Sequence, residues 1–252
     1  MAKPAVVIVG ADKGGVGKTT VARTLLDYLG AHHIPNRAFD TEVPRGTLSR
    51  FHGDQTEIVD VTSIADQMKI FDTLGSTPAQ VTVIDIRAGL LSSTLQALSD
   101  IGFLESAKKG QITFAVFHIL GPSIASLQEI AETAPFVGDA SYFLVKNHIN
   151  ETSFFDWDPA TYNSYFNQIK NAQEITIPKL NEMATEQVEV ASVPYVQFVA
   201  NKSGKGDAAN YSFVLRGYVR HWLGQVWGEY DKVKLVDLLA PKADNNVRQV
   251  AG

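Results

Sequence analysis

A glycine-rich stretch near the start of the chain carries the residue types best suited to chemistry. It reads Lys13-Gly14-Gly15-Val16-Gly17-Lys18-Thr19-Thr20 and follows the apolar run AVVIVG. Its glycines let successive backbone N–H groups turn inward around a phosphate, an approach that a Cβ would obstruct. Lys18 adds a full charge for the β- and γ-phosphates, and the hydroxyl of Thr19 suits Mg²⁺. The stretch therefore predicts a phosphate-binding loop that opens a helix, whose positive N-terminal end also attracts phosphate.

A carboxylate lies at the end of a second apolar run. Asp85 belongs to VTVIDI (81–86), a run that predicts a strand buried on both faces of a parallel sheet. Ligands bind at the carboxyl ends of the strands in such sheets, so we expect Asp85 to hold the Mg²⁺ shell through water. Capping of a helix that starts near Leu90 is the alternative role.

Short β-branched runs alternate with segments of helical spacing over the first 150 residues. The predicted strands are residues 5–10, 36–40, 57–61, 81–86, 112–119 and 141–147. The predicted helices are residues 19–29, 64–74, 90–107 and 123–133. This alternation predicts an α/β fold in which a mostly parallel, twisted sheet is flanked by helices on both faces.

The last hundred residues follow a looser pattern. ITIPKL (175–180) predicts a late edge strand ended by Pro178, and a long helix is expected from Asp207, as its cap, to about Tyr230. We expect a group of aromatic residues to pack under the sheet edge, with a partner-docking surface as the alternative. The group comprises Phe154, Phe155, Trp157, Tyr162, Tyr165 and Phe166.

Composition limits the classes of protein that the chain can be. Its 252 residues, 45% of them hydrophobic, favour a single domain over 1–252 with a polar C-terminal tail at about 240–252. The net charge of −5 gives no overall attraction for nucleic acid or acidic membranes, so such binding would need a local patch. There is no cysteine, which excludes disulfides and thiolate metal sites. No apolar run approaches the roughly 20 residues that span a bilayer, so we expect a cytoplasmic protein.

Residues Lys13 to Thr20 match the pattern KGGxGKT[ST], and the chain from residue 3 to about 150 resembles the ParA/MinD family of deviant Walker A ATPases. The resemblance implies a SIMIBI-type P-loop NTPase fold, ATP and Mg²⁺ as cofactors, and slow, partner-stimulated hydrolysis. It also implies an ATP-dependent homodimer in which Lys13 acts in trans on the phosphates bound by the other subunit. A cation that arrives only on dimerisation would make ATP join the subunits and would stabilise the leaving phosphate. A solvated loop lysine, or one that acts in cis, is the alternative.

The same resemblance gives expected roles to further positions. Asp40 matches an aspartate that ends the second strand beside the metal, and Glu42 occupies the position of a second aspartate that orients the attacking water. The extra methylene of Glu42 alters that geometry, which favours slow turnover; an exposed loop acid is the alternative. Asn147 falls where an amide reads the adenine edge, or it makes a turn of its own. Arg87 departs from the family pattern, and contact with phosphate, with Glu42 or with solvent stays open.

The function implied by the resemblance is an ATP-dependent dimerisation switch that partitions or positions cargo, as in plasmid or chromosome segregation. One competing class is an ATP-dependent biosynthetic enzyme on the same fold, against which Lys13 and the absence of a nucleophilic cysteine argue. The other is a weakly hydrolysing, nucleotide-dependent scaffold, which Glu42 keeps open.

Partners of such a switch include an activating protein and a matrix. Nonspecific DNA is the first candidate matrix, bound through a basic patch formed by Lys202, Lys205, Arg216 and Arg220, although a solvated helix face explains these residues equally well. A membrane is the second, through the apolar residues of KVKLVDLLAPK (232–242). Pro241 cuts that segment short, so membrane attachment is the less favoured reading.

Overall fold

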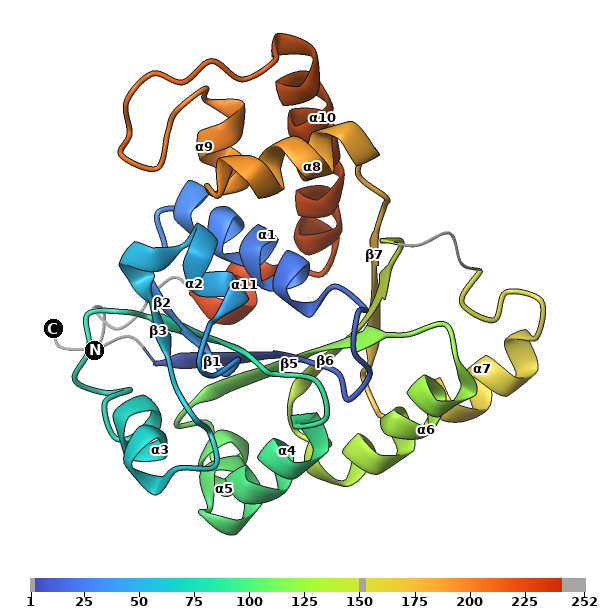
Figure 1. Ribbon diagram of the computed structural model, residues 1–252. Coiled ribbons are helices and arrows are strands. Elements are labelled where there is room, and N and C mark those ends of the chain that lie inside the picture. Colours follow the sequence, from blue (N-terminus) through green and yellow to red (C-terminus); the bar gives the residue numbers. More distant parts are fainter. Residues whose placement is uncertain (1–2, 150–152, 242–252) are drawn as a thin grey trace, which may run out of the picture.

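The structure, a computed structural model, describes residues 3–149 and 153–241 and is organised by one sheet of seven parallel strands (Figure 1). Their order across the sheet is β3-β2-β4-β1-β5-β6-β7. The strands are β1 (Ala5–Gly10), β2 (Asn36–Asp40), β3 (Thr56–Ile58), β4 (Val81–Asp85), β5 (Thr113–Leu120), β6 (Ser141–Asn147) and β7 (Gln173–Ile177). The predicted α/β class is confirmed, and every described strand pair is parallel.

Helices cover both faces of this sheet (Figure 1). On one face lie α1 (Lys18–Ala31), α2 (Thr47–Phe51), α8 (Glu182–Ala191), α9 (Tyr195–Val199), α10 (Phe213–Lys232) and α11 (Leu235–Leu239). On the other lie α3 (Ile64–Phe71), α4 (Leu91–Asp100), α5 (Phe103–Lys108), α6 (Ile124–Thr133) and α7 (Pro159–Phe166). Two 3₁₀ turns, Gly53–Gln55 and Ala134–Phe136, complete the described helical segments.

The two hydrophobic cores follow from the alternation of side chains along each strand. In β1, Val7 and Val9 belong to the core under α1 and α10, whereas Val6 and Ile8 belong to the core under α4 and α6. Successive residues of a strand point to opposite faces, so a continuous apolar run supplies both cores at once. This explains why the central strands are uninterrupted runs of apolar residues.

Strand register places the chemistry at one edge of the sheet. Asp85 of β4 is directly opposite Val9 of β1 on one side and Asp40 of β2 on the other. Because the strands are parallel, both aspartates and the loop that follows β1 meet at the carboxyl ends of neighbouring strands. The crevice outside these ends is where α/β sheets bind ligands.

Two predicted helices have different bounds in the structure. The helix expected over 90–107 divides into α4 and α5, because Gly102 adopts φ 75° and turns the chain between them. The long helix starts at Phe213, not at Asp207, and its cap is Ser212, whose side chain accepts a hydrogen bond from the Leu215 N–H. Asp207 instead lies in a turn, where its carbonyl accepts from Ser203 N–H. The predicted cap was therefore wrong.

The aromatic group and the C-terminal segment are mainly core. Phe154 and Tyr162 are buried, whereas Trp157 is 78% exposed.

In α11, Leu235 and Leu239 are completely buried, so the apolar residues that were the candidates for membrane attachment pack against the core. Among the described residues no helix is both long and apolar enough to cross a bilayer. Most of the predicted polar tail, residues 242–252, lies outside the described residues.

Candidate functional site

The predicted phosphate loop connects β1 to α1 with the conformation that its glycines permit. Gly15 and Gly17 have φ angles of 73° and 86°, a region that other residues rarely adopt. A Cβ on Gly17 would lie 2.2 Å from the side-chain nitrogen of Asn147, so glycine is also required there by space. Val16, between them, is buried and fixes the loop to the core.

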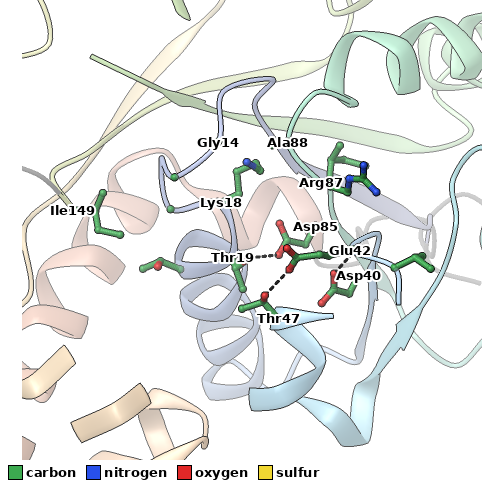
Figure 2. Close-up of a pocket in the computed structure, with 15 residues that line it drawn as sticks. Gly14, Lys18, Thr19, Asp40, Glu42, Thr47, Asp85, Arg87, Ala88 and Ile149 are labelled. Carbon is green, nitrogen blue, oxygen red and sulfur yellow. Dashed lines mark hydrogen bonds between the residues drawn. The ribbon is translucent and has the colours of Figure 1, made fainter. Parts of the chain in front are cut away.

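The loop forms one wall of a cavity of about 600 Å³ (Figure 2). Figure 2 shows Asp40, Glu42 and Asp85 close together beside Lys18 and Thr19, with Arg87 and Ile149 on opposite sides of the group. The lining residues are Gly14, Gly15, Gly17, Lys18, Thr19, Thr20, Asp40, Glu42, Val43, Thr47, Asp85, Ile86, Arg87, Ala88 and Ile149. The sequence-predicted loop and carboxylates are thus brought together, with Lys13, Val16 and Asn147 outside the lining.

Thr19 and Asp85 form the pair of oxygen groups best suited to a magnesium ion. The Thr19 hydroxyl donates to Asp85 Oδ2 at 2.7 Å. Burial and, to a lesser extent, the nearby Asp40 raise the pKa of Asp85 to about 7, although the Thr19 hydrogen bond and Lys18 act in the opposite direction. The described residues contain no group of three His, Cys, Asp or Glu side chains that could hold a metal. Mg²⁺ fits such a site, because it usually takes one or two protein oxygens and completes its shell with phosphate and water.

Asp40 organises the loop that follows β2. Its Oδ1 accepts from the Glu42 N–H at 3.0 Å, and its Oδ2 accepts from the backbone N–H groups of Leu48 and Ser49 at 2.7 and 3.3 Å. Burial raises the pKa of Asp40, and the three backbone hydrogen bonds act in the opposite direction. A Cβ on Gly46 would lie 2.4 Å from Asp40 Oδ2, so the carboxylate fills the space beneath the loop.

Glu42, in the loop after β2, and Lys18, at the start of α1, both line the cavity. The Glu42 carboxylate accepts a hydrogen bond from the Thr47 hydroxyl, at the first turn of α2. Lys18 Nζ donates to the Lys13 carbonyl at 3.0 Å, and burial lowers the pKa of Lys18 although four carboxylates raise it. Glu42, Thr47 and Lys18 are therefore held around the same space, with acceptors on one side and a cation on the other.

A second cavity, of about 500 Å³, adjoins the first. Thr20 and Ile149 line both cavities. The remaining wall comes from Asn147, Pro178, Lys179, Leu180, Glu182, Thr185, Glu186, Glu189, Tyr195 and Trp222. We call this the side cavity. Sequence reasoning missed it, because most of its wall comes from residues 178–180, α8 and α9, which carry no recognisable binding motif.

The arrangement of elements matches a solved protein. The crystal structure of a ParA family ATPase from Chlorobium tepidum TLS has a TM-score of 0.54 to this chain, over 87% of this chain and 97% of that one, at 14% sequence identity. The chain has a ParA-type fold. At that identity the likeness establishes the fold and not the activity.

Two further solved structures are similar to a lesser degree. They are the MinD cell division protein of Aquifex aeolicus (TM-score 0.47, 15% identity, 88% of this chain and 97% of that one) and a nucleotide-binding protein of Archaeoglobus fulgidus in complex with ADP (TM-score 0.47, 14% identity, 73% and 85%). No protein-family model and no curated protein matches the chain.

Within this ParA-type fold, Lys13 and Asn147 lie beside the phosphate cavity. Lys13 is exposed, and its Cγ lies near Gly121, at 3.3 Å from where a Cβ on that residue would be. Asn147 is 4% exposed, and its Nδ2 donates to the Val16 carbonyl at 3.0 Å. Asn147 therefore braces the loop from β6. The trans role of Lys13 and the base-reading role of Asn147 stay predictions.

Three residues that the sequence did not single out support the phosphate cavity. The Thr41 hydroxyl donates to the Asp85 carbonyl at 3.1 Å and accepts from the Arg87 N–H at 2.7 Å, which ties the segment after β2 to the segment after β4. Asp12 accepts from the Leu91 N–H at 2.8 Å and donates its own N–H to Glu129 at 3.0 Å. Such ties were not predictable, since isolated Thr, Asp and Glu residues carry no spacing pattern.

The predicted basic patch is only partly assembled on the surface. Lys202, Lys205 and Arg220 are exposed, but Arg216 is half-buried and donates to the Val199 carbonyl at 3.4 Å. Its Nε is buried without a hydrogen-bond partner among the described residues. Arg216 therefore contributes first to the packing of α10 on α9.

Proposed function

We propose that the chain is an ATPase that dimerises with ATP, hydrolyses it slowly and uses this cycle to position or partition cargo. The observation that carries the proposal is the Thr19–Asp85 hydrogen bond at 2.7 Å beneath a phosphate loop that contains Lys18. Its setting is a ParA-type fold, in which the loop opens a helix at the carboxyl edge of a parallel sheet.

The phosphates of ATP would lie in the 600 Å³ cavity. Backbone N–H groups of Gly14 to Lys18 would donate to the β-phosphate, and Lys18 Nζ would leave the Lys13 carbonyl to contact the β- and γ-phosphates. Thr19 and Asp85 would hold Mg²⁺, which neutralises charge that develops on the phosphate oxygens. Asp40 is the further metal-side carboxylate, through water, because its own oxygens already hold the loop.

The nucleoside would extend from Thr20 into the side cavity. Residues at the carboxyl ends of β6 and β7, Asn147 and Pro178, line that cavity together with Tyr195. Ile149, Tyr195 and Trp222 give the side cavity an apolar portion against which a base would pack. Asn147 offers its side-chain oxygen to the amino group of adenine.

Hydrolysis would depend on Glu42 holding a water in line with the γ-phosphate. The Thr47 hydroxyl already occupies one of its carboxylate oxygens, so the attacking water must take the other or displace Thr47. This competition supports slow basal turnover and stimulation by a protein partner that reorders the loop. It is also the observation that favours the second candidate, a nucleotide-dependent scaffold with little turnover.

Dimerisation would bring Lys13 of each copy to the phosphates of the other. Lys13 is exposed at the mouth of the loop, and its side chain does not line the cavity of its own chain. A cation supplied in trans favours the dimer only while the triphosphate is bound, which makes ATP a switch. Nonspecific DNA, bound through Lys202, Lys205 and Arg220, is the matrix that we propose for a cytoplasmic positioner.

Two measurements on the purified wild-type protein test this proposal. Calorimetric titration should give binding of ATP with Mg²⁺, and phosphate release should give slow turnover above the background hydrolysis of ATP. Binding without turnover would select the scaffold. Absence of ATP binding at millimolar nucleotide would overturn the proposed function.

A further inference from the structure

Glu189 of α8 joins two helices that flank the site. Its Oε1 accepts from Nη1 of Arg23, on α1, at 2.8 Å. Nη2 of Arg50, on α2, donates to the Glu189 carbonyl at 3.0 Å and to the Glu189 carboxylate. We call Arg23, Arg50 and Glu189 the arginine bridge.

Arg23 is the buried member of the bridge, with 2% of its surface exposed. Its guanidinium lies 3.3 Å from the ring centre of Phe51 and 4.2 Å from that of Tyr195. Its Nε and Nη2 have no hydrogen-bond partner among the described residues. A buried cation needs a carboxylate, so Arg23 holds Glu189 in one place.

The same glutamate contributes to the wall of the side cavity. Glu189 and Tyr195, which both contact Arg23, line that cavity together with Thr20 and Asn147. A nucleoside in the side cavity would therefore lie against the residues that hold the bridge. Glu189 is far from Glu42 in sequence, but the bridge connects this wall to Arg50, which lies in the same segment as Glu42.

The other end of the bridge reaches the hydrolytic loop through α2. This short helix is fixed at its start by Asp40, which accepts from the Leu48 N–H, and by the hydrogen bond of Thr47 to Glu42. Arg50 lies at its end. Because α2 is about one helical turn long, a shift of Arg50 near its end would be passed to Thr47 at its start, and through that hydroxyl to Glu42.

We propose that Glu189 is a positioning residue which, through Arg50 and α2, couples occupation of the side cavity to the placement of Glu42. The inference rests on the proposed function, because it assigns the side cavity to the nucleoside and the phosphate cavity to the triphosphate. A bridge that only braces the fold would make no distinction between ligands that fill the side cavity and ligands that do not.

The test variant is Arg50→Ala, compared with wild type on ATP and on inorganic tripolyphosphate. The Arg50 side chain is 47% exposed, so the loss of its ion pair should leave the protein folded with nearly the thermal stability of wild type. We expect kcat for ATP to fall at least about fivefold, while the Kd for ATP stays within about twofold and kcat for tripolyphosphate is unchanged. Arg50→Lys should recover part of the loss. Because Arg50→Ala removes both contacts to Glu189, adding Glu189→Gln to Arg50→Ala should lower kcat for ATP no further than Arg50→Ala alone.

Lys69→Ala provides the matched control. Lys69 makes an exposed ion pair with Glu57 that resembles the outer half of the bridge but lies on α3, away from both cavities. It should leave the ratio of the two kcat values at the wild-type level. Thermal unfolding of all variants separates loss of fold from loss of coupling.

Limited proteolysis gives a second readout that needs no turnover. Arg45 is exposed in the loop between Glu42 and α2. ATP, but not tripolyphosphate, should protect the bond after Arg45 from trypsin in wild type, and this protection should be lost in Arg50→Ala. Equal kcat ratios and equal protection in Arg50→Ala and wild type would overturn the coupling and leave the proposed function intact. A wild-type protein that does not bind ATP would overturn both.

Discussion

The phosphate-loop edge of the sheet and the surface of α10 show two ways in which functional residues are placed. At the loop, β1, β4 and β2 end side by side, and their registers bring Asp85 next to Asp40 and the loop. At α10, the residues four apart, Arg216 and Arg220, share a helix but not an environment, since Arg216 turns back to α9. Position in a parallel sheet determines the direction of a side chain far more strictly than spacing on a surface helix does. Substitutions at the loop should therefore have large effects, and substitutions on α10 small ones.

The largest expected effect comes from Lys18→Ala. Lys18 is the cation inside the phosphate cavity, and its loss removes a charge from a partly buried site. We expect the affinity for ATP to fall by roughly 100-fold or more, measured by calorimetry, with the thermal unfolding transition preserved. Lys13→Ala, which leaves the cavity lining intact, should retain binding as a monomer. An unchanged ATP affinity in Lys18→Ala would contradict the assignment of the phosphate loop.

Asp85→Asn should weaken the binding of ATP with Mg²⁺ and leave the binding of ATP without the metal nearly unchanged. Asparagine can still accept from Thr19 but has no charge for Mg²⁺. We expect ATP binding with Mg²⁺ to weaken roughly 10- to 100-fold, and binding in EDTA to stay close to wild type. If Mg²⁺ strengthened ATP binding equally in both proteins, Asp85 would have no part in the metal site.

Asp27, at the contact between α1 and α9, provides a test by pH. Burial raises the pKa of Asp27 from its usual 3.8 to about 7, and it does so against the opposing effects of Arg23 and two backbone hydrogen bonds. The folded protein therefore keeps a proton that the unfolded chain releases above pH 3.8. This contribution to stability is complete below about pH 3.8 and is lost as pH rises through about 7.

The expected result is a pH-dependent difference between wild type and Asp27→Asn in urea unfolding. The unfolding free energy of wild type minus that of the variant should fall by up to roughly 4 kcal/mol between pH 4 and pH 7, and level off above it. Taking the difference matters, because His52 lies 3.8 Å from Asp27 and its pKa is lowered to about 3 by burial. His52 makes the unfolding free energy of both proteins rise between about pH 3 and pH 6.5, and this contribution cancels in the difference. A difference that is flat with pH would refute the protonated state of Asp27.

The smallest effects are expected on α10. If duplex DNA is the matrix, Arg220→Ala should lower affinity a few-fold and reduce the salt slope of log K by about one. Arg216→Ala should leave the slope nearly unchanged and lower thermal stability, because that side chain is already engaged with Val199. Fluorescence anisotropy across a salt series measures both slopes. Equal slopes for the two variants would show that Arg216 also reaches phosphate.

Sequence patterns were sufficient where one backbone geometry satisfies a motif. The loop glycines, Thr19 and the strand-end Asp85 were located in advance, because a parallel sheet leaves few positions for them. The two cores were also predictable from continuous apolar runs. These features depend on local spacing and strand order.

Patterns were insufficient where placement depends on contacts between distant segments. The use of Asp40 as an acceptor for the start of α2 and the side cavity under α8 arise from tertiary packing. The cap of α10 was misplaced because Asp207 and Ser212 are both good caps, and the turn that binds Ser203 to Asp207 decides between them.

Light scattering coupled to size-exclusion chromatography tests the central claim most directly. Wild type with Mg²⁺ and a slowly hydrolysed ATP analogue should elute as a dimer, and with ADP as a monomer. Lys13→Ala, loaded with the same analogue to the same occupancy, should stay monomeric. A monomeric, analogue-loaded wild type, or a Lys13→Ala protein that dimerises as wild type does, would contradict the account.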